Sequence, residues 1–422
     1  MKLLKSIRKW LVNPKKSQVI LLFLAWKIWI LVFALLGLVF LPWHSSAFFG
    51  GGIENYSQYP LFLGWANFDG GQYLSIAQRG YIVSQHSYFP LYPYLMHILA
   101  PNSLFFLSLA GLAISHIAFF ASLVLFWHLL RLDYTEKVSF IVIVTLLVFP
   151  TSFYFGAVYT ESLFLFLALA TFYAARKGNW LIAGLCGAVA SATRIYGILL
   201  LPALFFEWFY QRELLGMQPR TLRGFFFFLP DALRQKIHEV AEKLKKSVGV
   251  SYWPLLPLLI IPLGLLAYMS YLASTTGDPF AFYTELATFG EQRGGGKIVL
   301  LYQVFWRYFK MIFTVTKSDP IYFTILMELA TAILALSLLM WGYLKKVRPS
   351  YLVFAALGYI LPTLTGSFSS LPRYVLVLFP LFIILGLFLS KRSNLVKIVL
   401  LSISAILLAI ETILFIKGYW VA

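Results

Sequence analysis

The chain has 422 residues, of which 60% are hydrophobic and 12% are charged, and its mean hydropathy is +0.82. A water-soluble domain of this composition would expose large apolar patches, so the composition excludes one and indicates an integral membrane protein. The net charge of +18 comes from short segments between apolar runs. That placement favours anionic lipid headgroups over nucleic acid as the partner.

Taken in chain order, the apolar runs are each long enough to cross a ~30 Å hydrocarbon core as a helix. The period-2 alternation typical of a membrane barrel is absent. The sequence therefore predicts an all-α, polytopic transmembrane helical bundle of about 11 helices, which forms a single integral-membrane domain over residues 1–422. The predicted spans are 18–42, 104–130, 138–156, 159–175, 180–194, 195–211, 252–273, 321–344, 350–367, 372–390 and 395–416.

The first apolar run is too long for a cleaved signal peptide and lacks a small-residue cleavage site, so we expect it to remain as a span. Residues 180–211 are long for one span and short for two, and we interpret them as two half-length helices that meet near Arg194, below the membrane surface. With a cytoplasmic N-terminus, this places 24 of the 34 Lys and Arg residues inside and 9 outside, as the positive-inside rule requires. The basic segment 212–250 has apolar residues at helical spacing, which predicts an amphipathic helix on the cytoplasmic leaflet.

The first and fourth outer loops, residues 43–103 and 274–320, are long and rich in Gly, Pro and aromatic residues, and we expect short interfacial helices in them. The outer face also collects a small set of polar residues, namely Asp69, Arg79, Glu161, Arg194 and Arg373. Acids and arginines at such depths are costly in lipid unless they line a wet cavity. We therefore expect these side chains to share one cavity.

Asp69 follows residues 65–68, a strand or a loop, and precedes a segment with helical spacing that ends at Gly80. Its carboxylate could simply cap this helix. Against that role, the adjacent Gly70 and Gly71 are poor helix starters but allow a substrate to approach the backbone closely.

The other candidate motifs also have structural interpretations. The stretch HSYFPLYPYL, residues 86–95, is typical of an interfacial aromatic belt, and alternatively its rings could stack on a sugar. Glu161 could be the ordinary acid of a helix N-terminus. Arg373 could extend to lipid headgroups or bind a phosphate. Two deep arginines on one face favour an anionic ligand.

Several motifs are absent from the sequence. It contains no D-x-D pair, no P-loop and no GxGxxG, so a metal-bound nucleotide sugar is not supported as a donor. The six histidines show no zinc spacing. We therefore expect neither a metal nor a cofactor.

An ordered set of motifs resembles a known family. The set consists of NFDGGQYLSIAQRGY with YFPLYP (67–93), FPTSFYFGAVYTESLF (149–164), ATRIYGILLLPAL (192–204), GDPFAFYTE (277–285), LPRYVLVLFPLF (371–382) and the terminal GYWVA (418–422). It resembles the PIG-V-like (GPI mannosyltransferase 2-like) mannosyltransferases and their prokaryotic relatives, which are GT-C glycosyltransferases. The similarity covers nearly the whole chain. Family members usually carry Trp-Asp in the first motif, whereas here three residues separate Trp65 from Asp69, and we align Asp69 with the family's aspartate.

The resemblance implies a GT-C-like fold whose active site faces the outer side of the plasma membrane, or the lumen of the endoplasmic reticulum in a eukaryote. It also implies a polyprenyl-phosphate-linked donor and transfer of a mannose-like sugar, with inversion, to a hydroxyl of a glycolipid or glycan acceptor. The lipid-phosphate sugar is then a substrate rather than a cofactor.

On this hypothesis Asp69 is the catalytic base, because a carboxylate within hydrogen-bond reach can take the proton of the acceptor hydroxyl. Arg194 and Arg373, with Arg79 in reserve, would bind the donor phosphate, because guanidinium groups bind phosphate bidentately and keep their charge when buried. Candidate sugar or acceptor contacts are Glu161, Gln72, Tyr73, His86 and Tyr92.

Two alternatives remain open. A transporter or flippase of lipid-linked sugars could use the same arginines and acid in a central cavity, and it predicts hydropathy-related repeats, which the sequence does not show. A non-catalytic scaffold subunit would not need Asp69.

Overall fold

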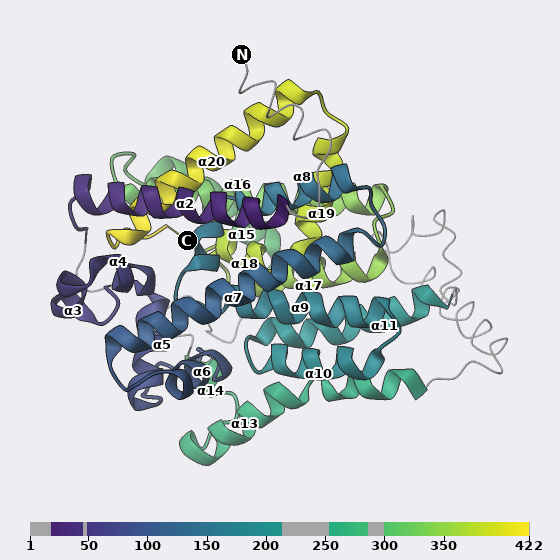
Figure 1. Ribbon diagram of the computed structural model, residues 1–422, viewed down its shortest axis with the longest axis horizontal. Helices are drawn as coiled ribbons and strands as arrows, with labels where there is room; N and C mark the ends of the chain where they lie inside the picture. The colour runs from purple at the N-terminus through teal and green to yellow at the C-terminus, as the bar shows by residue number, and fades with distance from the viewer. Residues whose placement is uncertain (1–17, 45–48, 213–252, 286–298, 422) are drawn as a thin grey trace.

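The structure is a computed structural model that describes residues 18–44, 49–212, 253–285 and 299–421. These residues form α-helices and short 3₁₀-helices, and no strand occurs among them. Figure 1 shows the helices gathered into one bundle. The predicted all-α fold is confirmed for the described residues.

Among the described residues, five helical segments are long and apolar enough to cross a membrane. They are α2 (Gln18–Phe40), α7 (Leu104–Leu130), Leu255–Thr276 formed by η6 (Trp253–Ile260) and α13 (Leu263–Thr276), α16 (Pro320–Leu344) and α20 (Asn394–Ile416). At most 44% of the most apolar window of each is buried inside the protein, so much of its apolar surface faces outward, where lipid is a favourable solvent. Helix length and composition thus describe a multi-pass membrane protein.

The remaining predicted spans coincide with shorter or interrupted helices. These are α8 (Glu136–Leu147) with η3 (Ser152–Gly156), α9 (Glu161–Arg176), α10 (Trp180–Ser191), η4 (Ile195–Leu199) with α11 (Leu200–Gln211), α17 (Pro349–Thr363), and α18 (Leu371–Leu376) with α19 (Phe379–Ser390). A helix of 12 residues such as α10 rises only about 18 Å, less than the ~30 Å core. The count of about eleven spanning helices therefore stays a prediction.

Residues 180–211 form two helices that meet near Arg194, as the sequence predicts. The chain is extended at Arg194, with φ −156° and ψ 149°, so α10 stops and η4 begins in a new direction. The turn is tight at Gly197, where an added Cβ would lie 2.3 Å from the backbone nitrogen of Ser191. The side chain of Gln211 donates a 3.1 Å hydrogen bond to the carbonyl of Ala175, so the chain returns to the end of the bundle that it left.

The two predicted outer loops do carry short helices. The first contains α3 (Gly52–Gln58), α4 (Pro60–Leu63), η2 (Gly64–Ala66), α5 (Asp69–Arg79) and α6 (Leu91–Leu99), and the fourth contains α14 (Ala281–Thr284) and α15 (Leu301–Thr314). Figure 1 shows α3 to α6 and α14 at one end of the bundle, which we call the loop end. The strand considered for residues 65–68 does not form, because η2 and a turn occupy them. The predicted amphipathic segment 212–250 lies, except for Arg212, outside the described residues.

A buried ionic cluster joins α9, α11 and α17 at the opposite end of the bundle. Glu207 is fully buried and accepts two hydrogen bonds of 2.7 Å from Arg348 and one of 2.6 Å from Ser350. Arg176 lies 3.6 Å from the same carboxylate and donates to both oxygens of Asp133. The Glu207 carboxylate therefore accepts several hydrogen bonds from the cluster, and a buried charge is stable only when it is paired and hydrogen-bonded in this way.

We expect Glu207→Gln to destabilise the folded protein strongly, because Arg348 and Arg176 would keep buried positive charge without their shared acid. Breaking a buried ion pair on one side costs about 3–5 kcal/mol. Thermal unfolding of the detergent-solubilised protein measures the effect. The matched control is Glu136→Gln, at an exposed acid, which should change stability by no more than about 0.5 kcal/mol. Equal melting temperatures for the two variants would contradict the prediction.

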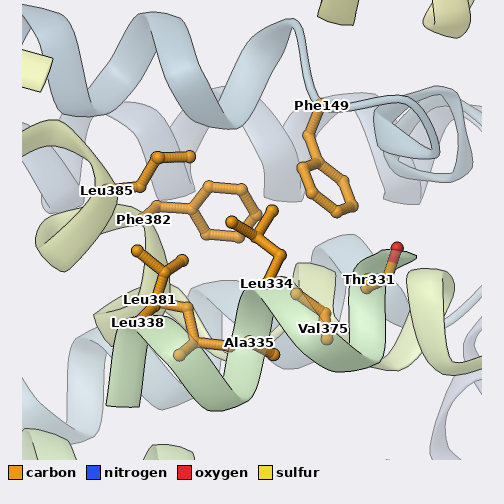
Figure 2. A pocket seen from close by; sticks show the side chains of 9 residues that line it. All are labelled: Phe149, Thr331, Leu334, Ala335, Leu338, Val375, Leu381, Phe382 and Leu385. Carbon is orange, nitrogen blue, oxygen red and sulfur yellow. The ribbon is translucent and has the colours of Figure 1, made fainter. Parts of the chain in front are cut away.

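A small cavity inside the bundle has no functional character. Figure 2 shows its walls, which come from the α8–η3 connection and from α16, α18 and α19. Its volume is about 10 Å³, and Thr331 is the one polar residue among nine that line it. A space of this size holds at most one water molecule, and an apolar lining gives that water few partners. It is a packing gap in the described core.

Candidate active site

Asp69 is held at the start of α5 by a turn that is anchored to the C-terminal helix. Asn67 is fully buried, and its amide donates hydrogen bonds of 2.9 and 3.2 Å to the carbonyls of Phe415 and Ile416. Phe68 follows with φ +56°, a conformation that a bulky residue rarely adopts. Such local strain persists when the surrounding contacts determine it, and it is concentrated at functional sites.

The two glycines after Asp69 have different surroundings. An added Cβ at Gly70 would lie 3.2 Å from the carbonyl oxygen of Val158, so this glycine lets α5 pack closely against the segment before α9. Gly71 lines the cavity described below. Close approach of a substrate to the backbone, which the sequence suggested for both residues, is therefore available at Gly71.

The carboxylate of Asp69 does not cap its own helix. The N-cap position is Phe68, and no side-chain hydrogen bond caps α5. Instead, Tyr88 Oη donates a 3.0 Å hydrogen bond to Asp69 Oδ1, and Arg373 Nη1 donates to Asp69 Oδ2. Burial and the neighbouring carboxylate raise the pKa of Tyr88, so its hydroxyl keeps its proton and remains a donor.

Arg373 reaches Asp69 from α18. Its side chain is 9% exposed, and its guanidinium lies 5.3 to 5.6 Å from the ring centres of Tyr154, Tyr159 and Tyr374. Aromatic faces attract a cation more strongly when water is excluded, so the rings help to retain this charge in the interior. The buried Nε of Arg373 has no hydrogen-bond partner among the described residues.

Arg194 is paired with Glu161. Arg194 Nη1 donates hydrogen bonds of 2.5 Å to Glu161 Oε1 and 3.1 Å to Thr160 Oγ1, and Glu161 is the first residue of α9. Glu161 Oε1 also lies 3.7 Å from Arg373 Nε, so this acid faces both arginines. The ring of Tyr374 lies 5.7 Å from the Arg194 guanidinium and 5.3 Å from that of Arg373. The predicted acids and deep arginines thus form one cluster, which we call the charged cluster: Asp69, Glu161, Arg194 and Arg373.

The charged cluster opens on a cavity of about 1140 Å³ at the loop end. Ligand pockets of roughly 300–1,000 Å³ enclose drug-sized molecules, so a sugar and its phosphate would fit. Of the predicted site residues, the walls include Asp69, Gln72, Tyr73, Arg79, Arg194 and Arg373. Glu161 lies behind Arg194, 1% exposed, and does not line the cavity.

Arg79 is separated from the charged cluster although it lines the same cavity. It is the last residue of α5, ten positions from Asp69 and hence about 15 Å along the helix. Its Nε donates to Ser75 Oγ at 3.1 Å, and its side chain is exposed. It can meet a ligand at the cavity mouth but does not join the two buried arginines.

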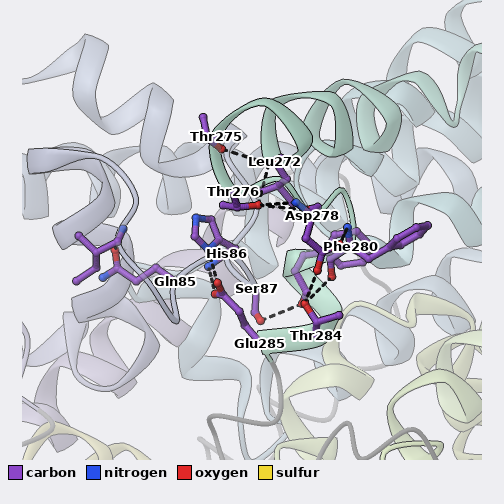
Figure 3. A network of polar contacts seen from close by, with 12 residues as sticks. Gln85, His86, Ser87, Leu272, Thr275, Thr276, Asp278, Phe280, Thr284 and Glu285 are labelled. Atoms are coloured by element: carbon purple, nitrogen blue, oxygen red, sulfur yellow. Dashed lines mark hydrogen bonds and ion pairs between the residues drawn. The ribbon is translucent and has the colours of Figure 1, made fainter.

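His86 does not line the cavity, contrary to the sugar contact predicted for it. Figure 3 shows its ring directed toward Glu285, and Nδ1 lies 2.7 Å from Glu285 Oε1. Tyr268 Oη donates a 2.7 Å hydrogen bond to the carbonyl of His86. These contacts fasten the loop that carries Tyr88 to α13 and to the residue that follows α14. His86 is therefore a residue that holds the wall of the cavity in place.

Tyr92 is also outside the cavity and is a packing residue, contrary to the predicted sugar contact. It is fully buried, and its hydroxyl lies 2.9 Å from the carbonyl of Gly111, to which it donates, and 2.8 Å from Ser115 Oγ. Tyr73 does line the cavity, with its hydroxyl 3.4 Å from Thr160 Oγ1. Gln72 also lines it and accepts a 2.7 Å hydrogen bond from Gln85.

Sequence reasoning did not assign Tyr88 or Tyr374 to the site. The sequence leaves Tyr88 open as a belt residue or as a ring that stacks on a sugar, whereas in the structure it donates a hydrogen bond to Asp69. The available signal was adjacency: Tyr374 follows Arg373, and Tyr196 is two positions after Arg194. The guanidinium of Arg373 lies over the ring of Tyr374, and that of Arg194 lies over the ring of Tyr196.

The two tyrosines of the same motif allow a matched test. On the glycosyltransferase hypothesis, we expect Tyr88→Phe to lower sugar transfer roughly fivefold with little change in stability, because Asp69 loses a donor that orients it, a contribution of about 1 kcal/mol. Tyr92→Phe should lower the melting temperature and leave transfer per folded molecule unchanged. Rates and thermal unfolding of both variants are the measurements. The reverse pattern would contradict our assignment of the two residues.

No three His, Cys, Asp or Glu side chains of the described residues are gathered so that they could hold a metal ion. The absence of a metal from the chemistry stays a prediction.

Comparison with known proteins gives a structural likeness only. No family model and no curated protein matches the sequence, so the resemblance to PIG-V-like mannosyltransferases stays a prediction. The fold is similar to the oligosaccharyltransferase of Archaeoglobus fulgidus in its apo form, with a TM-score of 0.45 and 14% identity over 97% of this chain and 57% of that chain. The same protein tethered to an acceptor peptide gives 0.45 and 14% over 97% and 56%, and its complex with zinc and sulfate gives 0.40 and 15% over 93% and 53%. This chain thus spans little more than half the length of that oligosaccharyltransferase, and a likeness of this degree assigns it neither a family nor an activity.

Proposed function

We propose that this protein is a membrane glycosyltransferase of the GT-C type that transfers a sugar from a polyprenyl-phosphate donor to an acceptor hydroxyl. The observation that carries the proposal is the charged cluster, in which one carboxylate and two arginines from distant segments face a single cavity at the loop end. Mannose is the proposed sugar, on the resemblance of the motifs. The plasma membrane is the proposed location, with the cavity on the outer side and a glycolipid or glycan as acceptor.

In this mechanism Asp69 accepts the proton of the acceptor hydroxyl as the hydroxyl oxygen bonds to the anomeric carbon of the sugar. The bond between that carbon and the phosphate oxygen breaks, and its electron pair stays on the phosphate. Attack from the face opposite the phosphate inverts the anomeric carbon. The leaving phosphate gains charge, which fixed guanidinium donors stabilise in a site with little water.

The charge distribution supports this division of roles. Arg373 lies in hydrogen-bond contact with the base, and Arg194 lies on the same wall. In an in-line displacement the acceptor oxygen and the leaving oxygen lie on opposite sides of one carbon, so the base and the phosphate site must face the same bound sugar from its two sides. Gln72 and Tyr73 line the same cavity and offer hydrogen-bonding groups for sugar hydroxyls.

The test is an assay of purified protein in phosphatidylcholine nanodiscs with synthetic mannosyl polyprenyl phosphate labelled in the sugar. Lipid extracts of cells that lack the gene serve as the acceptor source, and mass spectrometry detects the labelled product. Transfer by the wild type that is lost in Asp69→Asn would support the proposal. Movement of intact donor across proteoliposomes, without breakage of its sugar–phosphate bond, would instead indicate a flippase.

A further inference from the structure

Each oxygen of the candidate base accepts a hydrogen bond from a protein side chain. Tyr88 donates to Asp69 Oδ1 and Arg373 to Asp69 Oδ2. An acceptor hydroxyl needs one of these oxygens to receive its proton. The oxygen facing Arg373 is the better candidate for release, because the Tyr88 hydroxyl is neutral and its loop is held by the contacts of His86.

The charged cluster also has no spare positive charge. It contains two carboxylates, Asp69 and Glu161, and two guanidinium groups, Arg194 and Arg373. Arg194 is held by Glu161 and Thr160 together. A phosphodiester, which carries one negative charge, therefore meets a neutral cluster, and within this cluster it gains a full ionic partner only by displacing an acid from an arginine.

Arg373 is the arginine that can change partners. Asp69 is its one side-chain hydrogen-bond partner among the described residues, and its buried Nε makes no hydrogen bond, although it lies 3.7 Å from Glu161 Oε1. The centres of three tyrosine rings lie within 5.6 Å of its guanidinium, and this contact is the same whichever anion Arg373 binds. Asp69 is 25% exposed and lines the cavity, so this pair is open to a ligand.

We infer that the ion pair of Asp69 with Arg373 masks the base, and that a phosphate-bearing lipid must take over Arg373 before Asp69 can receive a proton. The donor therefore binds first and the acceptor second. This inference rests on the proposed function, since it concerns the order of substrates at the same site. In this order, an acceptor hydroxyl meets an unpaired carboxylate only while a lipid phosphate is bound.

The inference predicts the sign of an effect on binding. Asp69→Asn should bind a lipid phosphodiester more tightly than the wild type, with a dissociation constant roughly 5- to 10-fold lower, because the competing carboxylate is gone. The probe is farnesyl methyl phosphate, a phosphodiester without a sugar, titrated into protein in phosphatidylcholine nanodiscs. Inorganic phosphate is a second arm. If Asp69→Asn binds both ligands more tightly, the site recognises phosphate as such. If it binds only the farnesyl ester more tightly, the site recognises a lipid phosphate. Either result supports the exchange of Asp69 for a phosphate at Arg373.

Two controls separate the exchange from a general change of charge. Glu54→Gln removes an exposed acid from the same outer loop and should leave binding unchanged. In an Arg373→Gln background, Asp69→Asn should no longer tighten binding, because the two residues act as one unit. Should Asp69→Asn fail to give monodisperse protein, Asp69→Ser removes the same charge and should give the same sign.

The outcomes also distinguish this inference from the proposed function. Binding of the probe by Asp69→Asn that equals or falls below wild-type binding would overturn the exchange, even if that variant had lost transfer and thereby supported the enzyme. Equal tightening with and without Arg373 would overturn it as well. Arg373-dependent tightening in a protein that transfers no sugar would leave the exchange standing and remove the enzymatic proposal.

Discussion

Asp69→Asn is expected to lower sugar transfer by about 10²–10⁴-fold while the protein remains folded, since general base catalysis contributes that much. The asparagine is nearly isosteric and can still accept a hydrogen bond from Tyr88, so α5 and its turn should persist. The loss should lie in the rate of transfer at saturating donor rather than in donor binding. Transfer of labelled sugar under single-turnover conditions measures it.

The control for this variant is Asp278→Asn. Asp278 is a partly buried acid between α13 and α14, and its Oδ1 accepts a 2.8 Å hydrogen bond from the backbone of Phe280. It lines no part of the cavity, so its variant should retain transfer within about threefold. Transfer by Asp69→Asn at the wild-type rate would remove Asp69 as the base.

Arg373→Gln is expected to lower transfer about 10²–10³-fold, as the loss of one fixed donor to a developing charge does in other enzymes. Arg373→Lys should recover little of the rate, because an ammonium group lacks the rigid planar fork that binds a phosphate through two hydrogen bonds. Both variants should also weaken binding of farnesyl methyl phosphate. Rate and binding measured on the same preparations test the two roles together.

The comparison variant is Arg79→Gln, at the exposed end of α5. If the two buried arginines hold the phosphate, its loss should lower transfer no more than about fivefold, the scale of an exposed charge. A larger loss for Arg79→Gln than for Arg373→Gln would move the phosphate site to the cavity mouth. It would also contradict the role of the charged cluster.

Much of the architecture was predictable because membrane helices are specified locally. An apolar run of sufficient length satisfies its own backbone hydrogen bonds, so its existence does not depend on a distant partner. The two helices in residues 180–211 were predictable from the distribution of basic residues, and the end of α5 at Gly80 from its need for a positive φ. The separation of α8 from η3 and of α18 from α19 also has a local signal, Pro150 and Pro380, which the predicted spans 138–156 and 372–390 pass through.

The candidate site was predictable only as a set of residue types. Asp69, Arg194 and Arg373 stood out because charge is costly in an apolar chain, and the structure brings them to one cavity. His86 and Tyr92 had the same aromatic and polar character as Tyr88, and only the structure separates them. A motif of alternating prolines and tyrosines does not state which side of its loop faces the cavity.

The sequence by itself determined the helical membrane class, the approximate spans and the short list of charged residues, because each depends on composition within about twenty consecutive positions. The tertiary structure alone decided which charge meets which. Asp69 pairs with Arg373, 304 positions away, and Glu161 with Arg194, 33 positions away. Such pairs form because helices distant in sequence pack together, and no local pattern records the partner of a buried charge.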